Sequence, residues 1–287
     1  MNLNSPIITT YPIIAPYEKT THAWRRLLQH LVQNGRRVSA RGLTFNEMLN
    51  VSLTVDMVWP MVTSDIRNAS LKYYFGEAWW ILSGKGDLES ILPYNKNMAR
   101  YADNGQFFGA YGPPFQEQID RVADELIRDP NSRRAVLTLW RPNPPMDTKD
   151  FPCTISIQWV VRGGHLHCFD SMRSSDAWLG WPYDIFTFSC ASAYLSLLIK
   201  MKTGFFYPLG NITLNAISQH LYSTDIEKAI AVLKAEKEGT DRSYRVSLDP
   251  SRFENTSEFL TRLKELADQF GTSMEGLRDP CVPTLTI

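Results

Sequence analysis

The chain has 287 residues, of which 44% are hydrophobic and 21% are charged, as in ordinary soluble globular proteins. This composition excludes intrinsic disorder as a description of the whole chain. Lysine plus arginine and aspartate plus glutamate each number 30, so bulk charge predicts no polyanionic partner, and a few placed arginines must bind any phosphate.

The expected compartment is a reducing one. The four cysteines, Cys153, Cys168, Cys190 and Cys281, form no CxxC pair and no dense framework, which favours the cytoplasm over a disulfide scaffold. Met1–Pro16 lacks the pattern of a secretory signal, and the longest apolar stretch, near Ser192–Ile199, is too short to span a bilayer. No His/Cys/Asp cluster has metal-ligand spacing. We therefore expect a soluble cytoplasmic protein without metal, membrane or nucleic-acid partners.

The first half of the chain is predicted to be mainly helical. Residues 1–20 are expected to form an extended arm, because Ile7–Pro16 contains two prolines. Apolar residues then recur at helical spacing in three segments, which are Thr21–Asn34, Ala69–Leu82 and Gln116–Arg128.

The second half is richer in β-branched and aromatic residues. Three strands are predicted, with a hairpin turn at Gly163-Gly164, over Arg134–Trp140, Thr154–Val161 and Leu166–Met172. Three further helices are predicted at Ile185–Thr203, Asp225–Lys237 and Ser257–Phe270. The proline-rich connection Pro142–Pro152 separates strands of one sheet. The prediction is a single mixed α/β (α+β) domain over residues 1–287.

Cys153 is the candidate nucleophile. It stands at the end of a loop and begins a predicted strand, where it can face a cleft at a sheet edge. A reactive thiolate needs nearby positive charge to lower its pKa from about 8.5. Arg133, Arg134 and Arg173 supply that charge if the fold brings them together. The alternative is a small buried hydrophobe, which is the interpretation for the other three cysteines.

The residues just before the long helix form a second candidate site. Arg173 and Ser174 suit a phosphate, because a guanidinium offers a planar fork of donors and serine adds a hydroxyl. Gly180 and Pro182 are expected to bracket a tight turn at which backbone approaches a planar ligand. Asp184 would then fall at or just before the helix start, so a helix N-cap is its alternative role.

Arg133 and Arg134 are adjacent and precede a predicted strand. Neighbouring residues on a strand point to opposite faces, so both reach one phosphate only if the backbone is irregular there. The alternative is a solvated basic turn.

Taken in chain order, these motifs resemble the thymidylate synthase family from about Trp24 to Ile287. The matching stretches are Glu77–Gly84, Tyr111-Gly112, Asp129–Arg134, Pro152-Cys153, Arg173–Asp176 with Leu179–Tyr183, and His220–Tyr222. Each motif is weak alone, but the whole set in the family's order and near its spacing is specific.

The resemblance implies a homodimer. Its fold would be a twisted mixed sheet flanked by helices, dimerising through the sheet. Each active site would borrow Arg133 and Arg134 from the partner subunit, while Arg173 and Ser174 hold the phosphate from the same subunit. Arg41 resembles part of the family's flexible phosphate-binding loop.

The implied chemistry joins C5 of a pyrimidine nucleotide to the one-carbon unit of 5,10-methylenetetrahydrofolate. Attack by the Cys153 thiolate at C6 makes C5 an enolate-like nucleophile. Glu77 resembles the family's general acid/base, which works through water. The resemblance also assigns Tyr111 to the proton steps, Gln158 to the nucleotide, His220 and Tyr222 to the sugar 3′-hydroxyl, Asp176 and Gly180 to the folate, and the tail Pro283–Ile287 to closure over it.

At position 184 this chain has aspartate, whereas the thymidylate synthases carry asparagine there. In this respect the chain resembles the deoxycytidylate hydroxymethylases of the family. A protonated aspartate can donate to N3 of cytosine and accept from its 4-amino group. An ionised aspartate can accept from N3 once that nitrogen is protonated. We therefore expect cytosine to fit, and uracil to be penalised by about 1–3 kcal/mol, the cost of an unmatched buried polar pair.

Asn97–Asp103 is a second departure, because it lacks the tryptophan pair that shelters the methylene intermediate in thymidylate synthases. A less sheltered intermediate is open to water, which would give a hydroxymethyl product in place of a methyl one. In addition, Thr154 replaces the usual histidine after the nucleophile, and a lysine common near the folate tail is absent from Pro60–Ile66.

These inferences predict a cytidylate 5-hydroxymethylase that converts dCMP, methylenetetrahydrofolate and water into 5-hydroxymethyl-dCMP and tetrahydrofolate. Phages that modify their DNA use such an activity, and the enzyme would then lie in the host cytoplasm. One alternative is CMP as substrate, as in some nucleoside antibiotic pathways, because ribose and deoxyribose share the 3′-hydroxyl. Others are a methyltransferase making thymidylate or 5-methyl-dCMP, and an inactive relative acting as a nucleotide- or RNA-binding regulator.

Overall fold

The computed structural model describes residues 12–13, 19–277 and 285–287. The strands are β1 (Pro12–Ile13), β2 (Arg36–Ala40), β3 (Leu43–Asp56), β4 (Val136–Thr138), β5 (Thr154–Arg162), β6 (His165–Asp176), β7 (Leu209–Tyr222), β8 (Val246–Ser247) and β9 (Leu285–Thr286). The α-helices are α1 (Thr20–Asn34), α2 (Leu71–Leu82), α3 (Leu88–Ile91), α4 (Gly112–Arg128), α5 (Gly180–Thr203), α6 (Ile226–Glu238) and α7 (Thr256–Gln269). Most of the arm expected over residues 1–20 lies outside the described residues.

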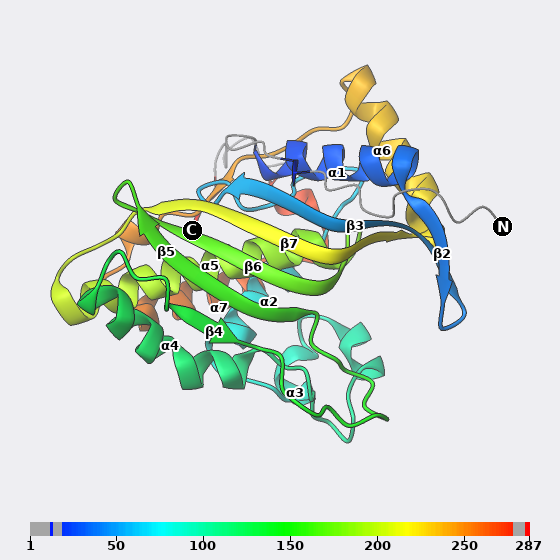
Figure 1. Cartoon of the computed structure of the whole chain (residues 1–287). Coiled ribbons are helices and arrows are strands. Elements are labelled where there is room, and N and C mark those ends of the chain that lie inside the picture. Colours follow the sequence, from blue (N-terminus) through cyan, green and yellow to red (C-terminus); the bar gives the residue numbers. More distant parts are fainter. Residues whose placement is uncertain (1–11, 14–18, 278–284) are drawn as a thin grey trace.

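Seven of these strands form one mixed sheet in the described part of the chain. Its order is β1-β3-β7-β6-β5-β4, with β2 paired to β3 beside this path. β3 and β7 are antiparallel, β7 and β6 parallel, and β6 and β5 antiparallel. Figure 1 shows the sheet twisted, with β5, β6 and β7 in front of α5 and α7. The predicted mixed sheet flanked by helices is therefore confirmed.

The predicted helices are confirmed, with small shifts at their ends. α2 begins at Leu71 because the Ser70 hydroxyl accepts a hydrogen bond from the Tyr73 N–H at 3.1 Å, which caps the helix. α4 begins at Gly112, before the predicted Gln116. Prolines occupy its first turn, where backbone N–H groups have no partner inside the helix.

The hairpin predicted at the glycine pair is also confirmed. β5 and β6 pair antiparallel up to Arg162 and His165. Gly163 and Gly164 connect the two strands. Their φ angles of 58° and 77° lie in the left-handed region, which glycine adopts without strain.

The two longest strands, β3 and β7, were not predicted. They pair with each other from Phe45 and Tyr222 to Asp56 and Asn211, at the centre of the sheet. Their alternation was present in the sequence, because Val51, Leu53 and Val55 are buried and the residues between them are not. β7 shows the same period of two.

The long helix α5 begins at Gly180, so the prediction of a turn at Gly180 and Pro182 was wrong. These residues form the first turn of the helix, and Asp184 lies inside it. By length and composition α5 would be able to cross a membrane, but 78% of its most apolar window is buried in the protein. It packs against β6 and β7 on one side and α2 and α4 on the other, as the core helix of this fold.

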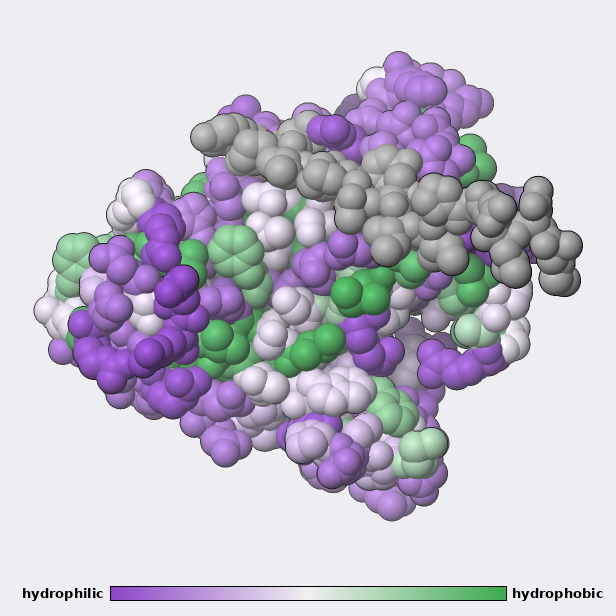
Figure 2. All heavy atoms as spheres, viewed as in Figure 1, coloured by the Kyte–Doolittle hydropathy of each residue, from purple (hydrophilic) through white to green (hydrophobic). Residues whose placement is uncertain are grey.

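The sheet face turned away from α5 carries exposed apolar side chains. Phe169 on β6 is 43% exposed, and Ile217 on β7 is 52% exposed. Figure 2 shows apolar side chains gathered across the middle of this view, where β5, β6 and β7 lie in Figure 1. Exposed apolar patches of this kind are typical of interaction surfaces.

Candidate active site

A cavity of about 370 Å³ opens where the ends of β6 and β7, the start of α5 and the middle of α2 meet. The predicted site residues that line it are Arg41, Glu77, Tyr111, Cys153, Arg173, Ser174, Asp176, Gly180, Asp184, His220 and Tyr222. Apolar and aromatic side chains complete the wall, among them Trp80, Ile81, Met98, Tyr101, Phe107 and Leu179. Residues separated by up to 181 positions thus converge on one cavity.

Cys153 is held at this cavity by Tyr111 and Arg173. The Tyr111 hydroxyl accepts hydrogen bonds from the backbone N–H groups of Cys153 at 3.1 Å and Thr154 at 3.0 Å. Arg173 donates to the carbonyl oxygens of Pro152 and Phe151, and its Nη2 lies 3.8 Å from the Cys153 Sγ. The backbone on both sides of the thiol is therefore fixed by side chains of the cavity.

The Cys153 thiol is neutral at pH 7 in the single subunit. Burial raises its pKa to about 11, and the nearby Arg173 guanidinium only partly opposes this effect. Arg133, Arg134 and Arg173 do not converge on this thiol within one subunit, because Arg173 is the only one of these three that lines the cavity. Forming the thiolate requires further positive charge or a proton acceptor.

Tyr111 has its own proton available for donation. Because its oxygen accepts from two backbone N–H groups, its O–H can point to another acceptor. Burial raises the pKa of Tyr111 well above its usual value, and ionisation of Cys153 or Asp184 would raise it further. Tyr111 is therefore a neutral hydrogen-bond donor beside the thiol.

Glu77 projects from α2 into the cavity as a half-buried acid. Its Oε1 accepts a hydrogen bond from the Tyr73 hydroxyl. Burial raises its pKa from 4.5 to about 7, although the Tyr73 hydrogen bond acts in the opposite direction. Near neutral pH the carboxyl can therefore both release and accept a proton.

Replacement of Glu77 by glutamine is expected to stabilise the protein at pH 8 but not at pH 4. The pKa of Glu77 is about 7 in the folded state and about 4.5 in the unfolded state, so between these pH values the folded state binds more protons. The free energy of unfolding therefore falls as the pH rises through this range. The expected gain in unfolding free energy at pH 8 is about 3 kcal/mol. Urea unfolding at the two pH values measures it, with the exposed Glu117→Gln as control. Equal losses of stability in wild type and Glu77→Gln between these pH values would contradict the burial of Glu77.

Asp184 lies in the second turn of α5, so the N-cap alternative is wrong. A side chain at Gly180 would place its Cβ 3.2 Å from the Asp184 Oδ2, and glycine leaves this space open. Burial first, and then the nearby Glu77, Asp170 and Asp176 carboxyls, raise the pKa of Asp184 well above its usual value. The protonated form of Asp184 is therefore favoured, and in that form the carboxyl group offers one O–H donor and one carbonyl acceptor.

Asp176, His220 and Tyr222 form the wall at the ends of β6 and β7. Asp176 accepts from the backbone N–H groups of Trp178 at 2.8 Å and Leu179 at 3.1 Å. The His220 ring packs 5.0 Å from the Tyr222 ring, and its buried Nδ1 has no hydrogen-bond partner in the described part of the chain. A bound ligand with a hydroxyl group would give this nitrogen a partner.

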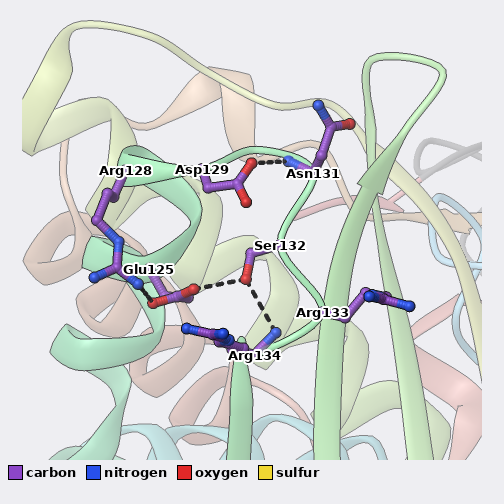
Figure 3. Close-up of a pocket in the computed structure, with 7 residues that line it drawn as sticks. All are labelled: Glu125, Arg128, Asp129, Asn131, Ser132, Arg133 and Arg134. Atoms are coloured by element: carbon purple, nitrogen blue, oxygen red, sulfur yellow. Dashed lines mark hydrogen bonds and ion pairs between the residues drawn. The ribbon is translucent and has the colours of Figure 1, made fainter.

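Arg133 and Arg134 do not line the Cys153 cavity. They line a separate hollow of about 650 Å³ with Glu125, Arg128, Asp129, Asn131 and Ser132. Figure 3 shows their guanidinium groups pointing in different directions, while Ser132 bridges Glu125 and the Arg134 backbone. Both arginines are exposed, and neither forms an ion pair with a described residue. Their backbone is irregular before β4, as two neighbouring arginines with a shared target would require.

Gln158 and Ile287 also lie away from the cavity lining. The Gln158 side chain donates to the Arg133 carbonyl at 2.9 Å, which places it beside the arginine pair. Ile287 is buried, its N–H donates to the Ser247 carbonyl, and its carbonyl accepts from the Asp249 N–H. Pro283 and Thr284, the start of the predicted closing tail, lie outside the described residues.

Tyr73 is the main neighbour of the site that the sequence did not single out. It precedes Glu77 by one helical turn, so the i,i+4 spacing on α2 was the available signal. Among described residues, no group of three or more His, Cys, Asp or Glu side chains is arranged to hold a metal ion.

Comparisons with known proteins show which proteins this chain is similar to. The family model described as thymidylate synthase matches residues 22–261, a range that contains every residue lining the Cys153 cavity. A deoxyuridylate hydroxymethyltransferase of Bacillus phage SP01 is 26% identical over 265 residues, which cover 81% of this chain and 67% of the phage protein. A protein of Methanothermobacter thermautotrophicus named "Putative thymidylate synthase" is 27% identical over 223 residues, covering 74% of this chain and 94% of that protein.

Proposed function

This chain belongs to the thymidylate synthase family and is a one-carbon transferase acting on a pyrimidine nucleotide, and we propose that it is a cytidylate 5-hydroxymethylase. The proposed reaction converts dCMP, methylenetetrahydrofolate and water into 5-hydroxymethyl-dCMP and tetrahydrofolate. The observation that carries the choice of cytosine is Asp184, a half-buried carboxyl group on the wall of the Cys153 cavity whose pKa is raised well above its usual value.

Cys153 is proposed to start the reaction by forming a bond from its sulfur to C6 of the base. The electron pair of the C5–C6 double bond then moves toward C5 and the ring atoms at positions 3 and 4, and C5 becomes the nucleophile. Tyr111 and Arg173 support this role because they fix the backbone and the position of the thiol. Once C5 carries the one-carbon unit, Glu77 is proposed to remove the C5 proton through water.

Asp184 is proposed to select the base by moving a proton. Its O–H would donate to N3 of cytosine while its carbonyl accepts from the 4-amino group. As sulfur adds to C6, the proton would pass from Asp184 to N3, so that the ring gains no negative charge. The pairing pattern alone does not exclude uracil, because a neutral acid can also donate to O4 and accept from N3–H. The preference for cytosine therefore rests on the basic N3, which uracil does not offer.

Hydration of the product is proposed from the segment Asn97–Asp103. Met98 and Tyr101 from this segment line the cavity, and Tyr101 is 44% exposed. The segment itself contains no tryptophan. Loss of the C5 proton is proposed to break the bond between the one-carbon unit and the folate nitrogen, which releases tetrahydrofolate and leaves an exocyclic methylene at C5. Water that reaches this carbon adds its hydroxyl group there, the C5–C6 double bond forms again, and the Cys153 sulfur leaves C6 and regains a proton.

Methylenetetrahydrofolate is the co-substrate that thymidylate synthase family enzymes use, and when bound it supplies the one-carbon unit. The cavity wall formed by Trp80, Ile81 and Leu179 offers an apolar surface suited to a flat pterin ring. Asp176 is proposed to bind the polar edge of that ring, and Gly180 to let it approach the backbone. Closure by the tail ending at Ile287 remains part of this proposal.

The active enzyme is proposed to be a homodimer that pairs the open sheet faces. Phe169 and Ile217 supply the exposed apolar surface for this contact. Arg133 and Arg134 would reach across it to the phosphate held by Arg173 and Ser174. The two additional positive charges would also lower the pKa of Cys153, which burial raises to about 11 in the single subunit.

Mixing two inactive variants is expected to restore activity if the arginines are shared. Arg134→Ala lacks the donated arginine and Cys153→Ser lacks the nucleophile. A mixed dimer has one site with neither defect, so refolding the variants together in equal amounts should restore about a quarter of wild-type activity. Steady-state assays of the refolded mixture measure this. Activity no higher than that of the separate variants would show that Arg134 acts within its own subunit or not at all.

The function itself is tested by mass spectrometry of the products. The purified protein is incubated with methylenetetrahydrofolate and an equal mixture of dCMP, CMP, dUMP and UMP. Gain of one CH₂O unit on a cytosine nucleotide supports the proposal, and the nucleotide that reacts identifies the sugar. Transfer of a methyl group to dUMP would contradict both the proposed preference for cytosine and the proposed hydroxymethyl product.

Hydroxymethylation of dUMP is the second candidate. The phage SP01 relative is named a deoxyuridylate hydroxymethyltransferase, and a neutral Asp184 can pair with uracil as well as cytosine. A gain of CH₂O on dUMP in the same experiment would favour it.

A further inference from the structure

Tyr73 is buried beside the site and does not line the cavity. Its hydroxyl donates a hydrogen bond to the Glu77 Oε1, and the same hydroxyl lies 3.5 Å from the Met98 Sδ. Its ring packs edge-on against the Tyr183 ring, with the centroids 4.8 Å apart. The phenol is therefore fixed in place and contacts one proposed catalytic residue and one residue of the cavity wall.

The direction of the Tyr73 proton follows from its three neighbours. The Asn95 side chain lies near the Tyr73 hydroxyl, where it opposes the rise in the Tyr73 pKa that burial and Glu77 cause. Asn95 uses its Oδ1 to accept from the Asn97 N–H at 3.0 Å, which leaves its NH₂ group as the donor that can face the phenol oxygen. Methionine sulfur is a weak acceptor. The single Tyr73 proton is thus directed at the Glu77 carboxylate.

We propose that Tyr73 is a positioning residue that holds the Glu77 carboxylate toward the cavity and stabilises its charge, and that Asn95 fixes the direction of the Tyr73 hydroxyl. This inference rests on the proposed general acid/base role of Glu77. It also ties that role to the cavity wall, because Met98 belongs to the segment Asn97–Asp103 through which water is proposed to enter, and Asn95 lies two residues before that segment. The order of this wall then controls how readily Glu77 is ionised.

Apart from the Tyr73 hydrogen bond, few described groups stabilise the ionised form of Glu77. The titratable groups that face it are Tyr73 and Tyr74 from α2, and Tyr183 and Asp184 from α5. None of these is a cation. Burial raises the pKa of Glu77 to about 7, and the Tyr73 hydrogen bond is the interaction that lowers it. Removing that donor leaves the ionised form less stable, so the pKa must rise further.

The test compares Tyr73→Phe with Tyr74→Phe in the full-length protein. Tyr74 is a matched control, because it is the next residue on α2, its ring also packs on Tyr183 at 4.4 Å, and its hydroxyl faces the Val62 carbonyl instead of Glu77. The protonation of Glu77 is followed by infrared difference spectroscopy, with the carboxylic-acid band assigned by its loss in Glu77→Gln. Tyr73→Phe is expected to raise the Glu77 pKa by about one pH unit, and Tyr74→Phe to leave it unchanged.

Asn95→Ala provides a second variant, which matters if Tyr73→Phe folds poorly. It should raise the Glu77 pKa in the same direction by a smaller amount, since the phenol remains but its proton is no longer directed. An unchanged Glu77 pKa in both Tyr73→Phe and Asn95→Ala would overturn the inference.

Activity against pH separates this inference from the proposed function. If Glu77 acts as the base, kcat/KM of Tyr73→Phe should fall about tenfold at pH 6 and recover at pH 9, because the fraction of ionised Glu77 falls and recovers with it. A raised Glu77 pKa with an unshifted activity profile, together with a fully active Glu77→Gln, would uphold Tyr73 as the group that stabilises Glu77. The same result would refute the catalytic role of Glu77.

Discussion

Replacement of Cys153 by serine is expected to lower kcat by at least about 10⁴-fold while leaving nucleotide affinity within a few-fold of wild type. A serine hydroxyl is a far weaker nucleophile than a thiolate, and no adjacent base activates position 153. The proposed phosphate-binding groups, Arg173 and Ser174, remain in place. Steady-state assays measure the turnover, and isothermal calorimetry with dCMP measures the affinity.

Cys190→Ser is the matched control for this experiment. Cys190 is buried on α5, where the hydroxyls of Ser189 and Ser192 already donate to carbonyl oxygens four residues earlier. A serine at position 190 can do the same, so full activity is expected. Retained turnover in Cys153→Ser would exclude covalent catalysis by this thiol. Absent turnover in the wild type, with nucleotide or RNA binding that survives the substitution, would favour the inactive regulator.

Replacement of Asp184 by asparagine is expected to change the ratio of kcat/KM for dCMP to that for dUMP by at least about a hundredfold in favour of dUMP. An amide can pair with either base, but it cannot transfer a proton to N3 of cytosine as sulfur adds to C6. Two to three kcal/mol of lost discrimination correspond to this change. Initial rates with each nucleotide, with methylenetetrahydrofolate held constant, measure the ratio.

Asp170→Asn is the matched control for Asp184→Asn. Asp170 on β6 is another buried carboxyl whose pKa burial raises, but it does not line the cavity. Its replacement leaves the Asp184 carboxyl in place and removes only one of the nearby carboxyls that raise the Asp184 pKa, so the base preference should change far less than in Asp184→Asn. An Asp184→Asn enzyme that still prefers dCMP as strongly as wild type would show that other contacts select the base. If the wild-type enzyme already prefers dUMP, hydroxymethylation of dUMP is the correct function.

The helices were predictable from the sequence because their signals are local. The apolar spacing within α1, α2, α4, α6 and α7 marked each one, and the glycine pair marked the β5–β6 hairpin. β3 and β7 were not predicted, because buried residues alternate over only part of each strand, Val51–Val55 in β3 and Ile212–Ala216 in β7. The start of α5 was misplaced because Gly180 and Pro182 favour a turn locally, whereas proline is equally suited to the first turn of a helix.

The sequence alone determined the family of this protein and most of its candidate site, because the motif residues and their order are carried by the chain itself. Only the tertiary structure decided which side chains meet, so that Glu77, Cys153 and Asp184 line one cavity while Arg133 and Arg134 lie elsewhere. It also decided the protonation of these groups. Burial raises the pKa of Glu77 to about 7 and raises the pKa of Asp184 well above its usual value, and burial is a property of the packed fold that no single residue or motif encodes.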